Sequence, residues 1–155
     1  MGVLAACGQT GESAVTQDGG GIEGPTVSWS LASSYPPSLD ILHGASERFA
    51  ERVAALTGGN FQIRVFPAGE IVPGDQVMDA VQQGTVQAGY TASYYYIGKS
   101  PALAFDTAVP FGLTARQQAA WIFHGGGLEE IRSVYSDFGI IHIPAANTRA
   151  PMGGW

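Results

Sequence analysis

Residues 26–66 read TVSWSLASSYPPSLDILHGASERFAERVAALTGGNFQIRVF, and two hydrophobic periods occur within this one segment. The first seven and the last six residues alternate apolar with polar side chains, as strands with one buried face do. Between them, apolar side chains recur at helical spacing over 39–56, with charged residues on the opposite face. Ser38 is the predicted N-cap of this helix, and TGGN at 57–60 is a typical stop. The segment therefore predicts a strand–helix–strand unit, the building block of a parallel sheet.

The remainder of the chain continues this alternation. The pattern predicts a helix at 75–83, a strand at 86–91, helices at 114–124 and 128–135 separated by three glycines, and a strand at 139–144, GIIHIP. Thr114 is the predicted N-cap of the helix that it begins. Because strands alternate with helices, we expect an α/β fold with a largely parallel sheet flanked by helices.

The composition is that of an acidic chain with few charged residues. Hydrophobic residues make up 45% and charged residues 13% of the sequence, whereas charged residues make up roughly 25% of an average soluble protein. The formal net charge is −6, and the seven basic residues are spread along the chain. Binding to nucleic acid needs a clustered basic patch, so this class of partner is excluded.

The N-terminal residues have features of an export and anchoring segment. LAAC at 4–7 matches a bacterial lipobox, in which the cysteine is lipid-modified and becomes the mature N-terminus. A chance occurrence explains these four residues equally well, but residues 10–24 are polar, rich in glycine and without a hydrophobic period, as a flexible tether is. We therefore expect 1–7 to be a partial lipoprotein signal, with Cys7 as the lipidated residue, and 8–25 to be a tether. No run of about 18 apolar residues predicts a membrane-spanning helix.

The residue types that carry catalysis do not form a recognisable motif. The spacing of His43, His124 and His142 suits no metal site, and a single cysteine leaves no Cys/His zinc site. No serine lies in a G-x-S-x-G nucleophile elbow. The glycines at 125–127 lack the lysine of a phosphate-binding loop, so they indicate a break between helices. No catalytic residue, metal or cofactor is predicted.

Three consecutive tyrosines, Tyr94, Tyr95 and Tyr96, are the most informative polar residues. They follow the strand predicted at 86–91, and α/β sheets bind ligands beyond the carboxyl ends of their strands. A tyrosine offers a flat apolar ring and a hydroxyl donor, which suit a closed pocket for a small polar ligand. The alternative is that the three rings pack beneath a loop.

Several blocks, in order along the chain, closely resemble the extracytoplasmic solute-binding subunits of TRAP transporters, the tripartite ATP-independent periplasmic systems. The nearest subgroup is the one linked to 2-oxoacids, lactate and related monocarboxylates. The resemblance covers roughly residues 26–155 and is carried by 29–39 (WSLASSYPPSL), 66–74 (FPAGEIVPG), 89–99 (GYTASYYYIGK), 108–118 (AVPFGLTARQQ), Trp121, 125–128 (GGGL) and 152–155 (MGGW).

The resemblance implies a periplasmic-binding-protein-like clamshell of two lobes. The lobes close on a small organic acid anion and pass it to the small and large TRAP membrane subunits, driven by an ion gradient. Because family members are longer than this chain, residues 26–143 are expected to form the first lobe, and 144–155 to begin a second lobe that is mostly missing. The implied location is the periplasm or the outer face of the cytoplasmic membrane, with membrane contact only through a lipid anchor.

The resemblance also implies ligand-binding residues. Ser33 and Ser34 fall in the loop after the first strand and face the cleft. Tyr94 and Tyr95 fall in the aromatic segment that lines the pocket, and Asn147 matches the asparagine in the loop that enters the second lobe. The arginine that pairs with the ligand carboxylate in this family lies beyond the last residue.

Pro151 stands where the subgroup usually has a glutamine that contributes to ligand or cation binding, so the resemblance does not extend to a cation site in this chain.

Two other functions remain open. The first is a sensor or scavenger module of the same fold that serves a signalling receptor. The second is an α/β enzyme acting on small acids, which would need a nucleophile or an acid–base pair in the cleft.

Overall fold

The computed structural model describes residues 24–107 and 109–145. The predicted strand–helix–strand unit is present as β1 (Val27–Ser33), α1 (Asp40–Leu56) and β2 (Phe61–Phe66). β1 and β2 pair in parallel, with Val27 opposite Phe61. The alternating and helical periods at the start of this unit therefore predicted its elements correctly.

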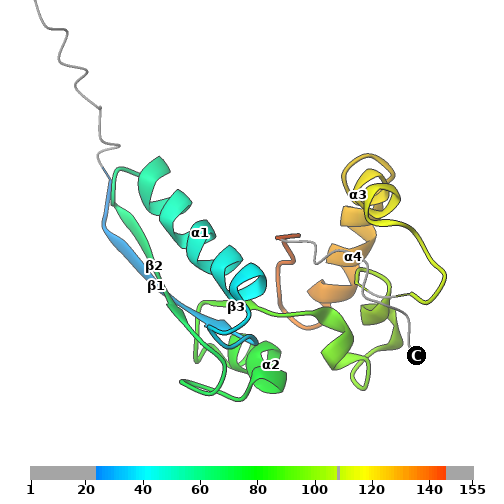
Figure 1. The fold of residues 1–155 in the computed structure, drawn as a ribbon, viewed down its shortest axis with the longest axis horizontal. Coiled ribbons are helices and arrows are strands. Elements are labelled where there is room, and N and C mark those ends of the chain that lie inside the picture. The colour runs from blue at the N-terminus through cyan, green and yellow to red at the C-terminus, as the bar shows by residue number, and fades with distance from the viewer. Residues whose placement is uncertain (1–23, 108, 146–155) are drawn as a thin grey trace, which may run out of the picture.

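A second, shorter crossover completes the sheet. A 3₁₀ turn (Gly74–Gln76) leads into α2 (Val77–Gln82), and β3 (Ala88–Tyr90) follows. β3 pairs in parallel with the carboxyl end of β1, so the sheet order in the described residues is β2–β1–β3. The chain moves to one side of β1 and then to the other, and right-handed crossovers therefore place α1 and α2 on opposite faces of the sheet (Figure 1). This confirms the α/β fold with a parallel sheet.

Small residues let α2 lie close against the carboxyl end of the sheet. Ala32 of β1 packs with Val77, Ala80 and Val86 in a small buried cluster. Gly89 of β3 allows this approach, because a Cβ at residue 89 would lie 2.7 Å from Val77 Cγ1. This packing fixes the position of the end of β3 and of the residues that follow it.

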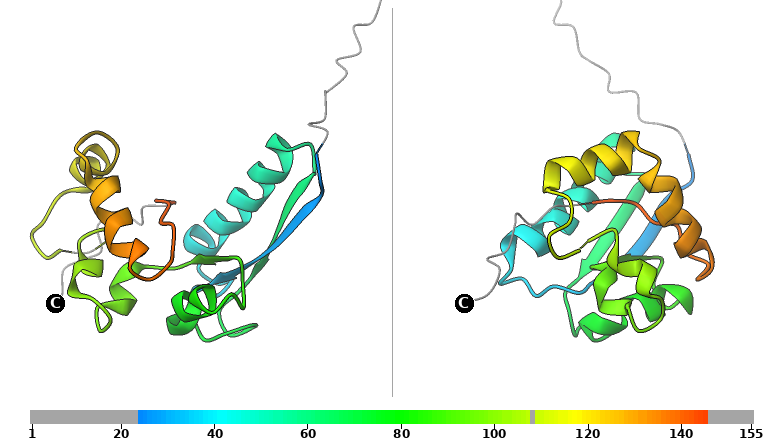
Figure 2. Two further views of the ribbon diagram at one scale, coloured as in Figure 1. Left: turned by 180° about the vertical axis from the view of Figure 1, so that it is seen from behind. Right: turned by 90° about the vertical axis from the view of Figure 1, so that its right-hand side faces the viewer.

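The chain after β3 forms a helical half. It contains two 3₁₀ turns (Ser93–Tyr96 and Pro101–Ala104), α3 (Ala115–His124) and α4 (Gly127–Ser136), grouped at a distance from α1 (Figure 2). Thr114 caps α3 as predicted: its side chain accepts from the Gln117 backbone N–H, and the Gln117 side chain accepts from the Thr114 backbone N–H. The predicted glycine break is confirmed by Gly126, which has a φ of 81°.

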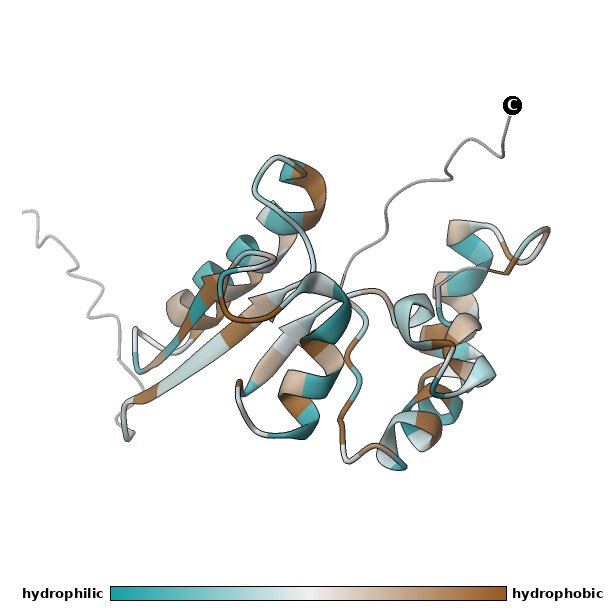
Figure 3. Ribbon diagram, turned by 90° about the horizontal axis from the view of Figure 1, so that it is seen from below, coloured by the Kyte–Doolittle hydropathy of each residue, from teal (hydrophilic) through white to brown (hydrophobic). Residues whose placement is uncertain are grey.

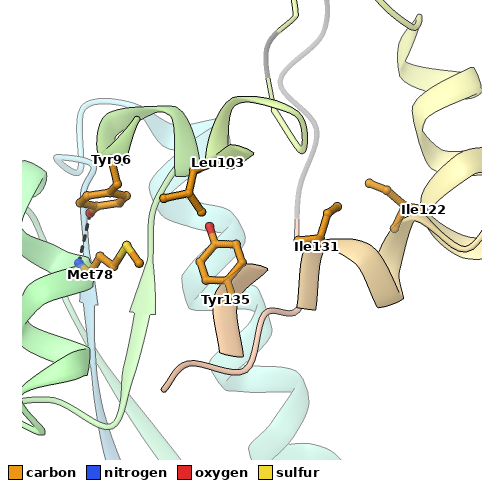
Figure 4. Close-up of a cluster of buried hydrophobic side chains, with 6 residues drawn as sticks. All are labelled: Met78, Tyr96, Leu103, Ile122, Ile131 and Tyr135. Atoms are coloured by element: carbon orange, nitrogen blue, oxygen red, sulfur yellow. Dashed lines mark hydrogen bonds between the residues drawn. The ribbon is translucent and has the colours of Figure 1, made fainter. Parts of the chain in front are cut away.

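One apolar cluster joins the sheet half to the helical half. Met78 from α2 packs with Tyr96, Leu103, Ile122, Ile131 and Tyr135, which all come from the helical half (Figure 4). Gln82 of α2 also donates a hydrogen bond to the Phe138 carbonyl. In Figure 3, apolar and polar residues alternate along the helices, as expected when one face of each helix packs inward.

Two local predictions are wrong. Residues 139–144 form no strand, because the Ile140 backbone N–H donates to the Tyr135 carbonyl and the Arg132 side chain donates to the His142 carbonyl, so this segment follows α4. The exposure of its side chains does alternate, but apolar side chains are on the exposed side: Ile141 is 80% exposed and Ile143 is 64% exposed. Ser38 is not the N-cap of α1; Leu39 holds that position, because a turn in which Leu39 N–H bonds to the Pro36 carbonyl starts the helix one residue later.

Candidate functional site

Three segments meet at the carboxyl end of the sheet. They are the residues after β1, the turn before α2, and the residues after β3. The Ser34 backbone N–H donates to the Tyr90 carbonyl at 2.8 Å, which extends the β1–β3 pairing by one bond. Gly74 comes so close to the first segment that a Cβ at this position would lie 2.7 Å from the Ser34 carbonyl oxygen. Ser34 therefore lies on a tightly packed edge.

Both predicted serines are engaged within the protein. Ser33 is 1% exposed, and its hydroxyl oxygen accepts a hydrogen bond from the Tyr35 backbone N–H at 3.1 Å. The Ser34 hydroxyl oxygen lies 2.5 Å from the Gly74 carbonyl oxygen and 2.6 Å from Thr91 Oγ1. Ser33 thus stabilises its own loop and Ser34 links distant segments, and a ligand would have to replace one of these bonds to reach either hydroxyl.

The three tyrosines point in different directions, because they lie in a 3₁₀ turn. Tyr96 is 3% exposed and its hydroxyl accepts from the Met78 backbone N–H at 3.1 Å, whereas Tyr94 and Tyr95 are each 42% exposed. The rings of Tyr94 and Tyr95 meet edge to face at 4.6 Å. Tyr96 therefore packs in the core, whereas Tyr94 and Tyr95 are half-exposed, and their role in lining a ligand pocket stays a prediction.

Two further tyrosines, which the sequence analysis did not single out, belong to this aromatic group. Tyr35 is buried directly after the two serines, and its ring meets that of Tyr90 edge to face at 5.6 Å. The side chain of Tyr35 also hydrogen-bonds to that of Tyr95. Tyr35 lies in the turn after the first predicted strand and Tyr90 in the strand predicted at 86–91, and only the pairing of β1 with β3 shows that the two are neighbours.

The aromatic group favours neutral phenols. Burial raises the pKa of the Tyr35 phenol above its ordinary value of about 10, and the nearby phenols of Tyr95, Tyr94 and Tyr90 raise it further. Hydrogen bonding to Tyr94, and then burial, raise the pKa of Tyr95 to about 12, although the hydrogen bond from Tyr35 partly opposes them. At neutral pH these residues are therefore uncharged hydrogen-bond donors.

A second polar cluster lies in the helical half. The carboxylate of Asp106 accepts a hydrogen bond from Ser93 and lies 3.1 Å from His142 Nε2, and His142 stacks on Tyr135 with ring centroids 4.8 Å apart. Burial and then the charge of Asp106 raise the pKa of the Tyr135 phenol. The carboxylate sits between the serine and the histidine, so no imidazole is placed to activate the serine. The cluster holds segment 140–145 against α4.

The other histidines do not join a metal site. His43 is buried in α1, 3.7 Å from Glu47, and His124 ends α3. Within residues 24–107 and 109–145, no group of three or more His, Cys, Asp or Glu side chains could hold a metal ion.

Among the helices of this same part of the chain, none combines the length and apolar character needed to cross a bilayer. Cys7 and Asn147 lie outside the described residues, as does Pro151.

Comparison with known proteins assigns the chain to a family. Residues 32–144 match the model of the bacterial extracellular solute-binding proteins, family 7. The chain is 55% identical, over 98% of its length, to a monocarboxylate 2-oxoacid-binding periplasmic protein of a Nostoc species, but it spans only 40% of that relative.

Solved structures give the same result. A TRAP transporter solute-binding protein of Bordetella bronchiseptica is 49% identical with a TM-score of 0.74, over 76% of this chain and 35% of that one. A TRAP periplasmic solute-binding protein of Pseudoalteromonas atlantica, solved with bound sodium and pyruvate, is 36% identical with a TM-score of 0.72, over 75% of this chain and 35% of that one. These relatives are solute-binding proteins rather than enzymes, and they include the same parallel sheet. The chain therefore belongs to family 7 of the bacterial extracellular solute-binding proteins.

Proposed function

We propose that the complete protein is the extracytoplasmic solute-binding component of a TRAP-type transporter, and that it captures a small carboxylate such as a 2-oxoacid or lactate. The observation that carries this proposal is the exposed pair Tyr94 and Tyr95 at the carboxyl end of β3. The Nostoc relative is named for monocarboxylate 2-oxoacids, and the Pseudoalteromonas relative was solved with pyruvate.

The chemistry of the tyrosine pair suits a monocarboxylate. A phenol donates a charge-assisted hydrogen bond to a carboxylate without bringing a charge of its own into the cleft. The raised pKa of Tyr95 keeps this donor protonated over the whole physiological range. The flat rings give a small ligand an apolar wall that excludes water. Tyr94 and Tyr95 are accordingly the direct donors in this proposal, and Tyr95 exchanges its hydrogen bond to Tyr94 for one to the ligand.

The remaining predicted residues have supporting roles. Ser33 and Ser34 support the residues around the tyrosines and do not donate to the ligand, because their hydroxyls are already bonded within the protein. Asn147 supplies an amide donor from the segment that enters the second lobe. Residues 26–143 form the first lobe, and closure of the second lobe over the sheet edge traps the ligand. The membrane subunits of the transporter then receive it, with no chemical turnover.

Calorimetric titration of the complete product of the locus with pyruvate, lactate and pyroglutamate tests this proposal. We expect saturable binding of at least one acid, weakened about tenfold or more by Tyr94→Phe or Tyr95→Phe, because each removes a hydrogen bond to a charged group. Ser136→Ala is the control, since it removes an exposed hydroxyl at the end of α4. Calcium in parallel titrations decides whether a cation assists. Failure to bind any acid, or consumption of pyruvate seen by NMR, contradicts the proposal.

The family places the protein outside the cytoplasm, and we propose that Cys7 anchors it there by lipid modification. Metabolic labelling with a radioactive fatty acid, followed by membrane fractionation, measures this directly. We expect label and membrane association in the natural protein, and neither in Cys7→Ser. An unlabelled protein that fractionates with the soluble periplasm would leave the transport proposal intact but remove the anchor.

A further inference from the structure

A continuous chain of hydroxyl groups connects the aromatic segment to the end of β1. The hydroxyl chain, as defined here, consists of Ser34, Thr91 and Tyr96. Thr91 Oγ1 lies 2.6 Å from Ser34 Oγ and 3.0 Å from the Tyr96 hydroxyl oxygen. A backbone N–H, that of Met78, bonds to one end at 3.1 Å, and a backbone carbonyl, that of Gly74, lies 2.5 Å from the other.

A backbone group lies at each end of the hydroxyl chain. The Ser34 hydroxyl is placed to donate to two acceptors, the Gly74 carbonyl and Thr91 Oγ1, and its single proton satisfies one of them at a time. At the other end, the Met78 N–H donates to the Tyr96 oxygen (Figure 4). The Tyr96 proton is therefore available for the contact with Thr91.

The hydroxyl chain ties together parts of the molecule that are far apart in sequence. It joins the loop after β1, the turn before α2, the first turn of α2 and the aromatic turn 93–96. Removing one hydroxyl leaves a neighbouring donor or acceptor unpaired in a partly buried site, which costs more than the bond itself contributed. The orientation of the aromatic turn therefore depends on all three hydroxyls.

We infer that Thr91 and Tyr96 are positioning residues, which hold the aromatic turn so that Tyr94 and Tyr95 face the ligand. This inference rests on the proposed function for its consequence, because the oriented residues are the proposed donors. Tyr96 acts through its hydroxyl at one end of the turn, with its ring 6.4 Å from that of Tyr95. Thr91 connects the Tyr96 hydroxyl to Ser34, the residue directly after β1. Neither residue needs to touch the ligand.

Two substitutions of Thr91 isolate the hydroxyl. Thr91→Val keeps the shape of the side chain and removes the hydroxyl, whereas Thr91→Ser keeps the hydroxyl. The orientation of Tyr95 is followed by ¹⁹F NMR of the complete protein with 3-fluorotyrosine incorporated at position 95, and pyruvate affinity is followed by calorimetry. We expect Thr91→Val to move the fluorine signal and to weaken pyruvate binding about fivefold to tenfold. We expect Thr91→Ser to leave both close to the natural protein.

The outcomes separate this inference from the proposed function. If the natural protein binds no pyruvate or related acid, the proposed function fails, and the fluorine signal alone still decides whether Thr91 orients Tyr95. An unmoved signal in Thr91→Val overturns the inference, and so does a Thr91→Ser protein that behaves like Thr91→Val. Affinity that stays unchanged while the signal moves also overturns it. Tyr96→Phe, which leaves the ring in the core, must reproduce the effect of Thr91→Val.

Discussion

At the scale of single residues, the environment of each tyrosine decides whether it packs in the core or faces the outside. Tyr94, Tyr95 and Tyr96 are adjacent in sequence, yet one is buried and two are half-exposed. Burial and the neighbouring phenols raise the pKa of Tyr35, and a hydrogen bond to Tyr94, followed by burial, raises the pKa of Tyr95, so these two phenols are uncharged at neutral pH. This property has a measurable dependence on pH.

We predict that the contribution of the raised-pKa phenols to stability is constant at neutral pH and falls above about pH 10. A phenol whose pKa is raised in the folded state stays protonated there while the unfolded chain ionises, so folding loses free energy between about pH 10 and the folded value, which is about 12 for Tyr95. Tyrosinate absorbance, recorded during an alkaline titration, measures these pKa values. Tyr35→Phe should make the loss of stability shallower. Titration of all tyrosines near pH 10 in the folded protein would contradict this prediction.

At the scale of elements, glycines decide how closely the segments of the site approach. Gly89 lets α2 lie on β3, and Gly74 lets the turn before α2 touch the segment after β1. Hydrophobic periodicity predicts the elements themselves but contains no information about these separations. The closeness at Gly74 is the more important one for the site, since the Ser34 hydroxyl bonds to the Gly74 carbonyl.

We predict that Gly74→Ala destabilises the protein by about 1–3 kcal/mol, because the new Cβ would lie 2.7 Å from a backbone carbonyl that cannot easily move. Urea denaturation measures the change in the free energy of unfolding. Gly98→Ala is the matched control, because a Cβ at residue 98 meets no atom within 4 Å. Equal effects of the two substitutions would show that the contact at Gly74 is unimportant.

At the scale of the whole molecule, one apolar cluster makes the sheet half and the helical half depend on each other. Met78 of α2 packs among side chains of the helical half, with Leu103 and Tyr135 at the centre of the cluster (Figure 4). Leu103 is 1% exposed. Because Tyr96, the neighbour of the proposed ligand donors in the aromatic turn, belongs to this cluster, the cluster also stabilises their position.

We predict that Leu103→Ala destabilises the protein by about 2–5 kcal/mol, through lost burial and the cavity that remains. The loss should appear in both halves at once, so hydrogen exchange should increase in α2 as well as in α4. Leu56→Ala is the matched control, since Leu56 is 66% exposed at the end of α1. Faster exchange confined to the helical half would show that the two halves are independent.

Local patterns were sufficient for most elements. The alternation in β1 and β2, the helical period of α1 and the Thr114 cap depend on neighbours within a few residues, so periodicity and capping rules predicted them. The rule that ligands bind at the carboxyl ends of strands pointed to Tyr94 and Tyr95. The resemblance to TRAP solute-binding subunits identified the family, which the comparisons confirm.

Contacts between distant residues decided the rest. Ser34 bonds to residues 40 and 57 positions away, and no local pattern indicates that its hydroxyl is already occupied. Residues 139–144 alternate like a strand, yet they follow α4, because their backbone groups bond to that helix and His142 turns inward to Asp106. A segment forms a strand only where a neighbouring strand pairs with it, and a hydroxyl is occupied only where a partner lies within hydrogen-bonding distance. Both are set by three-dimensional packing, whereas periodicity reports only which side of a segment is apolar.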